Sequence, residues 1–178
     1  MPHSSKYLEV LFSGTEMGKL IRKKDWSKTE LGPIEYWPQS LLTSLNICLS
    51  SRFPMVVWWG KKLHILYNDE YCKILGDKHP RSLGQPGLVC WEEIRDLVQP
   101  ALEIAQKGDS YWAKDAFRIL ERNSRKEEAY ISYSYSPILD EAGNIAGVFT
   151  TATETTENVL SERQFSKIQA ELSLERTK

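Results

Sequence analysis

The chain lacks the features that mark several large classes of protein. Its 23 Lys and Arg residues and 24 Asp and Glu residues leave a formal net charge of −1, without the basic excess that nucleic-acid binding usually needs. The longest apolar run, around residues 55–59, is far too short to span a bilayer. No N-terminal stretch combines a charged start with an apolar core, so no secretory signal is predicted. We therefore expect a cytoplasmic protein with no nucleic-acid partner and no membrane segment in this chain.

Cysteine and histidine are also scarce, and their spacing indicates no catalytic or metal site. Three cysteines form an odd set without metal-type spacing, which is typical of reduced thiols in the cytosol. The three histidines have no sequence neighbours that suggest a catalytic triad or a zinc site. A Gly-rich phosphate loop is absent, as is anything like a phosphoacceptor helix or an ATP-binding lid. We expect no enzyme activity from this chain.

Aromatic residues are plentiful, and the hydrophobic pattern is that of one mixed domain. Six Trp and eight Tyr among 178 residues imply large buried contacts or a lined pocket. Period-2 alternation and apolar runs predict strands at 53–60, 63–67, 111–119, 128–137 and 145–153. Helical spacing predicts helices at 39–50, 70–75, 91–98, 100–108 and 157–178. This order predicts an α+β fold, a five-stranded antiparallel sheet with helices on one face.

We divide the chain into three parts. Residues 1–38 are an N-terminal extension whose apolar and aromatic side chains wrap over the domain, although 1–14 are expected to be poorly ordered. Residues 39–156 are the domain itself, including its amphipathic N-terminal helix. Residues 157–178 are a charged C-terminal helix that leads toward an output domain beyond this chain.

Several short stretches, in this order and spacing, resemble a known family. They are Asp25-Trp26-Ser27, Leu31-Gly32-Pro33, Trp37-Pro38-Gln39-Ser40-Leu41, Ser51-Arg52-Phe53-Pro54-Met55, Trp59-Gly60, Tyr67-Asn68-Asp69, Lys78-His79-Pro80, Leu83-Gly84, Ser134-Tyr135-Ser136-Pro137 and Glu154-Thr155-Thr156. Together they resemble the PAS domains of bacterial two-component or hybrid sensor histidine kinases. The resemblance implies a sheet and flanking helices that enclose a pocket, and a sensory input that acts on a downstream kinase domain through the C-terminal helix.

The same resemblance implies a junction between the last strand and that helix. PAS domains often carry Asp-x-Thr there, and this chain has Glu154, Thr155 and Thr156. The longer carboxylate of Glu154 is expected to shift the usual contact.

No cofactor is expected, and haem and flavin are both disfavoured. Flavin-binding light sensors of this fold carry a reactive cysteine in an Asn-Cys-Arg-Phe-Leu stretch, which this chain lacks. Haem-binding relatives usually supply a histidine before the third strand, and residues 87–108 contain none. Cys90 is better interpreted as a buried apolar cysteine than as a haem ligand.

A small-molecule pocket remains as the sensory hypothesis. If Phe117 points inward, alternation carries Asp115 to the same face, and a carboxylate there needs a partner or a ligand. Tyr133 and Tyr135 would line the adjacent strand and offer hydroxyl groups to a polar ligand. The alternative, which we favour, puts Asp115 at the wet margin of its strand and makes the tyrosines part of the core.

The C-terminal helix carries one narrow apolar seam. Phe165, Ile168 and Leu172 recur at spacings of three and four among charged residues. We interpret the seam as a coiled-coil contact in a homodimer, against the alternative of a helix folded back on its own domain. The 39–50 helix would join that interface or cover the outer face of the 53–60 strand. A domain that only dimerises or docks partners, without a ligand, is the second candidate function.

Overall fold

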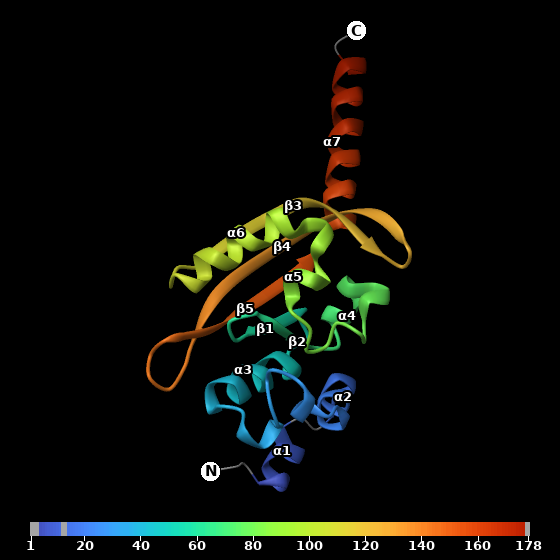
Figure 1. Cartoon of the computed structure of the whole chain (residues 1–178). Coiled ribbons are helices and arrows are strands. Elements are labelled where there is room, and N and C mark those ends of the chain that lie inside the picture. The colour runs from blue at the N-terminus through green and yellow to red at the C-terminus, as the bar shows by residue number, and fades with distance from the viewer. Residues whose placement is uncertain (1–3, 12–13, 177–178) are drawn as a thin grey trace.

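The computed structural model describes residues 4–11 and 14–176 and has one five-stranded antiparallel sheet (Figure 1). The strands are β1 (Met55–Trp59), β2 (His64–Tyr67), β3 (Tyr111–Arg122), β4 (Arg125–Leu139) and β5 (Ile145–Glu154). Their order across the sheet is β2-β1-β5-β4-β3. The predicted α+β class and the five antiparallel strands are confirmed.

Helices surround the sheet and continue past its last strand. They are α1 (Ser5–Leu11), α2 (Glu16–Lys23), α3 (Gln39–Ser50), α4 (Tyr71–Leu75), α5 (Gly87–Cys90), α6 (Arg95–Gln106) and α7 (Thr156–Arg176), with 3-10 turns η1 (Trp26–Lys28), η2 (Ile34–Tyr36), η3 (Gly76–Lys78) and η4 (Glu92–Ile94). The described part of the chain contains no helix with both the length and the apolar composition needed to cross a bilayer.

Helix α6 corrects one prediction, because it runs through Pro100 without a break. Proline removes one intrahelical hydrogen bond, which led us to expect a new helix there. Pro100 itself is exposed, whereas the flanking Val98, Ala101 and Leu102 are buried. Packing of that apolar face against the sheet outweighs the lost bond.

The sheet is covered on both faces at β1, the strand next to the β2 edge. Side chains alternate along β1, so Trp58 points toward α5 and packs beside Gly87, while Val57 and Trp59 point the other way. We call the side facing α4, α5 and α6 the inner face. Helix α3 packs on the outer face of β1 and β2 (Figure 1), one of the two roles left open by the sequence.

The N-terminal extension packs into the same core as the sheet. Met17, Ile21, Trp26 and Trp37 are all buried in it. The Asp69 carboxylate accepts hydrogen bonds from the first backbone N–H groups of α2, at 3.2 and 2.8 Å. A carboxylate at a helix N-terminus is favourable because it meets unpaired N–H groups and the positive end of the helix dipole. Within the segment expected to be poorly ordered, residues 5–11 form α1, and residues 1–3 and 12–13 lie outside the described residues.

Candidate functional site

A small cavity lies between the inner face of the sheet and helices α4 and α6, with η4 and its flanking Trp91. Its volume is about 50 Å³. It is lined by Tyr71, Ile74, Trp91, Ile94, Leu97, Val98, Arg118, Leu120, Ile131, Tyr133, Tyr135, Thr150 and Ala152. Most of these side chains are apolar or aromatic, which is the usual lining of a small-molecule site.

Besides Tyr71 and Trp91, four polar side chains line this cavity, all from strands of the sheet. The Arg118 guanidinium donates to the Tyr133 hydroxyl and lies over the Tyr133 ring, with 5.4 Å between the guanidinium carbon and the ring centroid. The Thr150 hydroxyl accepts a hydrogen bond of 3.0 Å from the Trp58 indole. Tyr135 packs edge-on against Tyr133, with ring centroids 5.4 Å apart. The predicted pocket residues Tyr133 and Tyr135 therefore lie together in one cavity wall.

Burial keeps the phenols of this wall in their neutral, donating form. Desolvation raises the pKa of Tyr135 and of Tyr71 far above the ordinary value of a phenol. Desolvation also raises the pKa of Tyr133, against the opposing effect of the Arg118 charge. At neutral pH the cavity therefore contains one fixed positive charge and phenolic hydroxyl groups that can donate a hydrogen bond.

The other two predicted pocket residues, Phe117 and Asp115, do not line the cavity. Phe117 is 44% exposed on the outer face, where it packs against Tyr130 with ring centroids 5.5 Å apart. The cause is a β-bulge: Ala113 pairs with Tyr133, but Ala116 pairs with Ile131, so β3 contains one extra residue. That extra residue inverts the alternation beyond it.

Asp115 occupies the bulge and has a backbone φ of 49°. Asp tolerates this left-handed conformation better than most residues do. Its carboxylate accepts hydrogen bonds from the hydroxyls of Thr155, at 2.7 Å, and Ser132, at 3.2 Å. Asp115 is therefore part of the strand-to-helix junction rather than of the cavity, and its carboxylate is not free in solvent.

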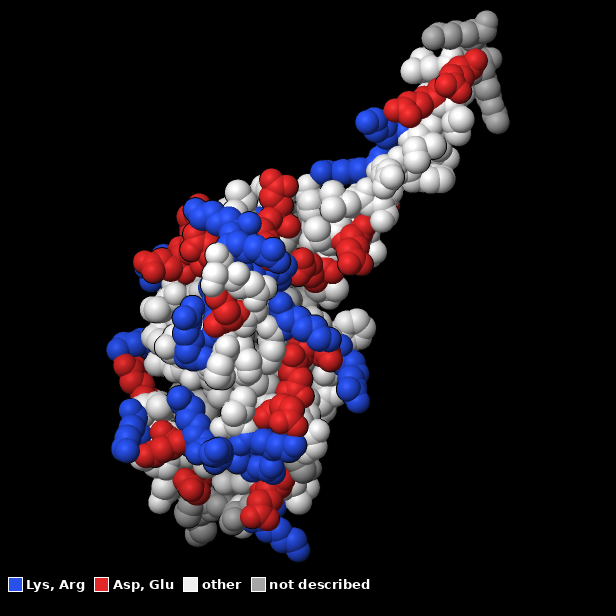
Figure 2. All heavy atoms as spheres, turned by 90° about the vertical axis from the view of Figure 1, so that its right-hand side faces the viewer, with Lys and Arg blue, Asp and Glu red and all other residues white. Residues whose placement is uncertain are grey.

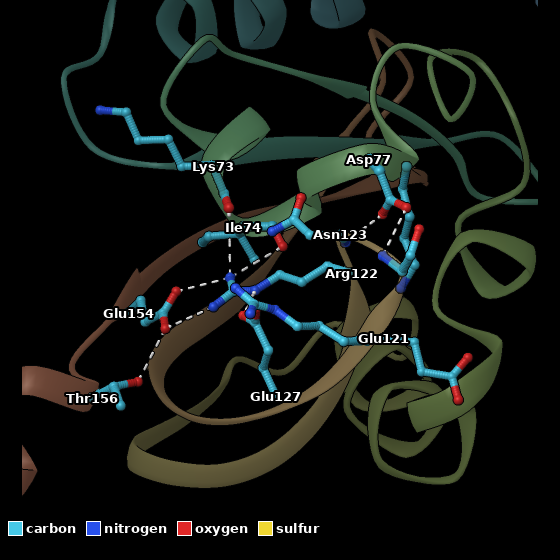
Figure 3. Close-up of polar contacts among 12 residues, drawn as sticks. Lys73, Ile74, Asp77, Glu121, Arg122, Asn123, Glu127, Glu154 and Thr156 are labelled. Carbon is cyan, nitrogen blue, oxygen red and sulfur yellow. Dashed lines mark hydrogen bonds and ion pairs between the residues drawn. The ribbon is translucent and has the colours of Figure 1, made fainter.

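On the inner face the junction is held by Arg122, which is 8% exposed (Figure 3). Its two terminal nitrogens each donate to one carboxylate oxygen of Glu154 at 2.9 Å, and its Nε donates to Glu127 at 2.8 Å. It also reaches the carbonyl oxygens of Lys73 and Ile74 at the end of α4. The paired hydrogen bonds fix both distance and orientation, so Glu154 is tied to α4, β3 and β4 at once.

On the outer face the next two residues are held by β4. The Thr155 backbone N–H donates to the Tyr130 carbonyl at 2.7 Å, and the Tyr130 N–H donates to the Thr156 hydroxyl at 3.0 Å. The Thr156 hydroxyl also donates to Glu154 at 3.1 Å. The three predicted junction residues thus form one connected network that fastens the start of α7 to both faces of the sheet.

Helix α7 leaves the body of the protein (Figure 1), and its apolar seam is exposed. Phe165, Ile168 and Leu172 are 62%, 46% and 52% exposed. The Arg163 guanidinium lies 4.9 Å from the centroid of the Tyr130 ring, next to the junction. Acidic and basic side chains are intermixed over the body and along α7 on the face in Figure 2.

Other buried titratable groups near the cavity form structural contacts. Cys90 is 6% exposed and its thiol donates to Ser82 at 3.2 Å. Lys78 and Glu93 form a largely buried ion pair, and the Lys78 ammonium lies 4.3 Å from the Trp91 ring centroid. Within residues 4–11 and 14–176, no group of three or more His, Cys, Asp or Glu side chains is arranged to hold a metal ion.

Comparison with known proteins gives the fold. No protein-family model and no curated protein matches the sequence. An RNA-binding Light-Oxygen-Voltage receptor superposes with a TM-score of 0.52 at 16% identity, over 84% of this chain and 43% of its own, so this chain spans less than half of that receptor. The PAS domain of Bordetella pertussis BvgS gives a TM-score of 0.49 at 16% identity, over 74% of this chain and 97% of its own.

A sensory box histidine kinase/response regulator from Burkholderia thailandensis is also similar, with a TM-score of 0.45 at 16% identity over 67% of this chain and 89% of its own. At such identities the likeness concerns the fold. The five-stranded antiparallel sheet in the order β2-β1-β5-β4-β3, followed by a C-terminal helix, is a PAS-like fold.

Sequence reasoning missed Arg118 and Arg122, the two cations that organise the cavity and the junction. Simple alternation placed Arg118 on the outer face, and Arg122 lay beyond the end of the predicted 111–119 strand. The only local signal was Asp115, a residue type that tolerates positive φ, within a strand of otherwise regular pattern.

Proposed function

We propose that this chain is the sensory input domain of a signal-transducing histidine kinase, which binds a small ligand in the cavity and relays binding through α7. One observation carries the proposal: strands β3 and β4 each supply residues both to the cavity and to the junction. On β4, Ile131 and Tyr133 line the cavity, whereas Tyr130 holds Thr155 and Thr156 from the other face. On β3, Arg118 lines the cavity and Arg122 holds Glu154.

This arrangement gives a mechanical route from ligand to helix. A ligand that binds one packing of β3 and β4 better than another shifts the population toward the first packing. Because Glu154, Thr155 and Thr156 are fixed to those strands, the start of α7 follows the shift. The helix then conveys the change to the kinase domain as a change in its orientation or pairing.

Three further statements belong to the proposal. The chain has no catalytic step of its own, since the kinase reaction belongs to the downstream domain. It carries no haem or flavin and responds instead to a small organic ligand. It acts as a homodimer in the cytoplasm, in which Phe165, Ile168 and Leu172 of α7 pair with the same residues of a second copy.

The experiment tests the junction in the full-length protein. Glu154→Ala and Thr156→Ala should each abolish the response of autophosphorylation to ligand while leaving the domain folded. Glu157→Ala is the matched control, since Glu157 lies exposed in the first turn of α7 and its side chain makes no hydrogen bond or ion pair in the described part of the chain. Unchanged regulation in both junction variants would reject the proposal.

A second candidate is a dimerisation or docking module that binds no ligand. It is favoured by the exposed apolar residues on the outer face of β3, where Trp112, Phe117 and Ile119 are 71%, 44% and 48% exposed. Mass spectrometry of the denatured protein separates the two candidates, because a retained small molecule supports sensing. Full regulation of the kinase by a variant whose cavity is filled, such as Ala152→Leu, supports the docking module.

A further inference from the structure

Arg118 is a cation without a counter-ion at the wall of an apolar cavity. Its guanidinium donates to the carbonyl oxygen of its neighbour Phe117 at 2.7 Å and to the Tyr133 hydroxyl. These are both neutral acceptors, and no carboxylate in the described chain forms an ion pair with it. The remaining N–H groups of the guanidinium fork have no protein partner there.

The Arg118 side chain points toward the cavity although its strand lies at the edge of the sheet. Arg118 lies on β3, the edge strand of the sheet, from which a long cationic side chain can extend into water. Instead it lies along the inner face over the Tyr133 ring. A positive charge that faces an apolar wall loses hydration, and this cost is offset when an anion binds beside it.

A second group in the cavity also lacks a partner. Tyr135 is 7% exposed, and its hydroxyl makes no hydrogen bond to any residue that the structure describes. No fully enclosed side-chain polar atom in that part of the chain is unsatisfied, so this hydroxyl opens onto the cavity space. Its neighbour on the wall, Tyr133, brings a second hydroxyl beside Arg118. The unused donors of the site therefore converge on one small space.

We propose that the cavity binds a short-chain organic monocarboxylate, whose carboxylate group is held by the Arg118 fork and by the Tyr135 hydroxyl. This inference rests on the proposed function of the cavity as a ligand site and names the class of ligand. The planar guanidinium matches the two oxygens of a carboxylate. The apolar remainder of the ligand lies against Trp91, Ile94 and Val98.

Size and donor count separate this ligand from other anions. An engineered apolar cavity of about 150 Å³ accommodates benzene, so a cavity of about 50 Å³ has room for roughly two to four heavy atoms. A phosphate group presents more oxygens and more charge than one guanidinium and two phenols can satisfy. Leu97, which is 43% exposed, lies at the rim of the cavity, so the tail of a longer acid can extend past it toward solvent.

The test compares acids with uncharged analogues of the same shape. Acetate, propionate and butyrate, and in parallel acetamide, propionamide and butyramide, are titrated into the chain while NMR shifts of the cavity residues are followed. At pH 7 each acid should bind about tenfold or more tightly than its amide. Arg118→Gln should weaken propionate binding by about tenfold or more and leave propionamide binding unchanged, which also reports that the cavity has folded.

Two further variants sharpen the result. Arg118→Lys keeps the charge but loses the planar fork, so its affinity for propionate should fall between those of the parent and Arg118→Gln. Arg52→Gln removes the same side chain from an exposed position between α3 and β1, and should change every affinity by less than about twofold.

The outcomes distinguish the two proposals. Equal binding of acids and amides, or propionate binding that survives Arg118→Gln, overturns the carboxylate assignment and leaves the cavity as a site for neutral ligands. Failure of both series to bind the parent chain overturns the carboxylate assignment and also counts against the cavity as a ligand site.

Discussion

Arg122 and Glu154, which lie 32 residues apart in the sequence, form a two-pronged ion pair at the point where β5 becomes α7. Arg122 is almost fully buried, while the Glu154 side chain is 31% exposed. The hydrogen bonds that Arg122 donates to Glu154, and to a lesser extent the one to Glu127, raise the pKa of Arg122. This pair ties the start of α7 to β3, the strand that also supplies Arg118 to the cavity.

The first prediction concerns the stability of this junction. Arg122→Met should lower the free energy of unfolding by about 2–4 kcal/mol, because it leaves Glu127, Glu154 and the end of α4 without their shared donor. Arg125→Met is the control, since the Arg125 side chain is 73% exposed and its ion pair should contribute less than about 1 kcal/mol. Urea unfolding of both variants measures the difference. Equal losses of unfolding free energy in the two variants would show that burial of Arg122 does not make its contacts more stabilising than those of exposed Arg125.

The second prediction concerns Asn68, which is 1% exposed and joins β2 to three other segments. Its side-chain oxygen accepts from the N–H groups of Met55 and Tyr71, both at 3.0 Å. Its amide nitrogen donates to the carbonyls of Cys48 and Phe53 at 3.0 and 2.7 Å. Asn68→Ala should cost about 2–4 kcal/mol, because several buried backbone groups lose their partner together.

Thermal melting and urea unfolding check the Asn68 prediction. Asn158→Ala, at an exposed position of α7, should change stability by less than about 0.5 kcal/mol. A melting temperature for Asn68→Ala equal to that of the parent would show that water replaces the lost contacts without cost.

The third prediction is that the cysteines react slowly in the folded protein. Burial raises the pKa of Cys72 to about 12 and raises the pKa of Cys48 and of Cys90 as well. A raised pKa lowers the thiolate fraction at pH 8, and the thiolate is the reactive form. Alkylation by iodoacetamide, followed by mass spectrometry, should therefore be roughly 100-fold slower than in denaturant. A cysteine that reacts equally fast in both conditions would contradict its buried environment.

The fourth prediction is a pH dependence from Asp77. Its carboxylate accepts from the N–H groups of Asn123 at 2.7 Å and Ser124 at 3.1 Å in the β3–β4 turn (Figure 3). These contacts, that of Asn123 first, lower the pKa of Asp77. Because the folded pKa lies below the unfolded value of about 3.9, the stabilisation is present above that value and is lost as the pH falls through the folded pKa.

Asp77→Asn should therefore destabilise the domain at pH 7, and the difference from the parent should shrink at pH 2.5. Urea unfolding at the two pH values measures it. Asp109→Asn is the control, because the Asp109 side chain is exposed and makes no hydrogen bond in the described part of the chain. A difference that stays constant between the two pH values would exclude the charged carboxylate as its source.

The fifth prediction concerns pairing through α7. Ile168→Glu places a charge in the middle of the exposed seam and should shift a dimer toward the monomer in light scattering at micromolar concentration. Ala170→Glu adds the same charge at an exposed position on the opposite side of the helix and should leave the mass unchanged. A parent chain that is itself a monomer at that concentration would argue against dimerisation by this helix.

Much of the element order was predictable because its signals are local. The 39–50 helix was predicted with the bounds of α3, since Pro38 marks its start and leucines recur at helical spacing. The turn between β4 and β5 has an equally local signal, because it contains Gly143, whose positive φ of 84° glycine adopts without steric cost. Pro100 misled the prediction for α6, because tertiary packing outweighed a local preference.

The α+β class and the number of strands followed from the sequence alone, and the family resemblance implied that Glu154, Thr155 and Thr156 lie where the last strand meets the helix. Only the tertiary structure decided that Arg118 faces the cavity and that Asp115 joins the junction. The reason is physical: alternation tells which residues share a face only while the strands stay in register, and one extra residue in β3 reverses that assignment beyond it. Whether a strand contains such a bulge is decided by its pairing with a partner strand, and that pairing forms between residues far apart in the sequence.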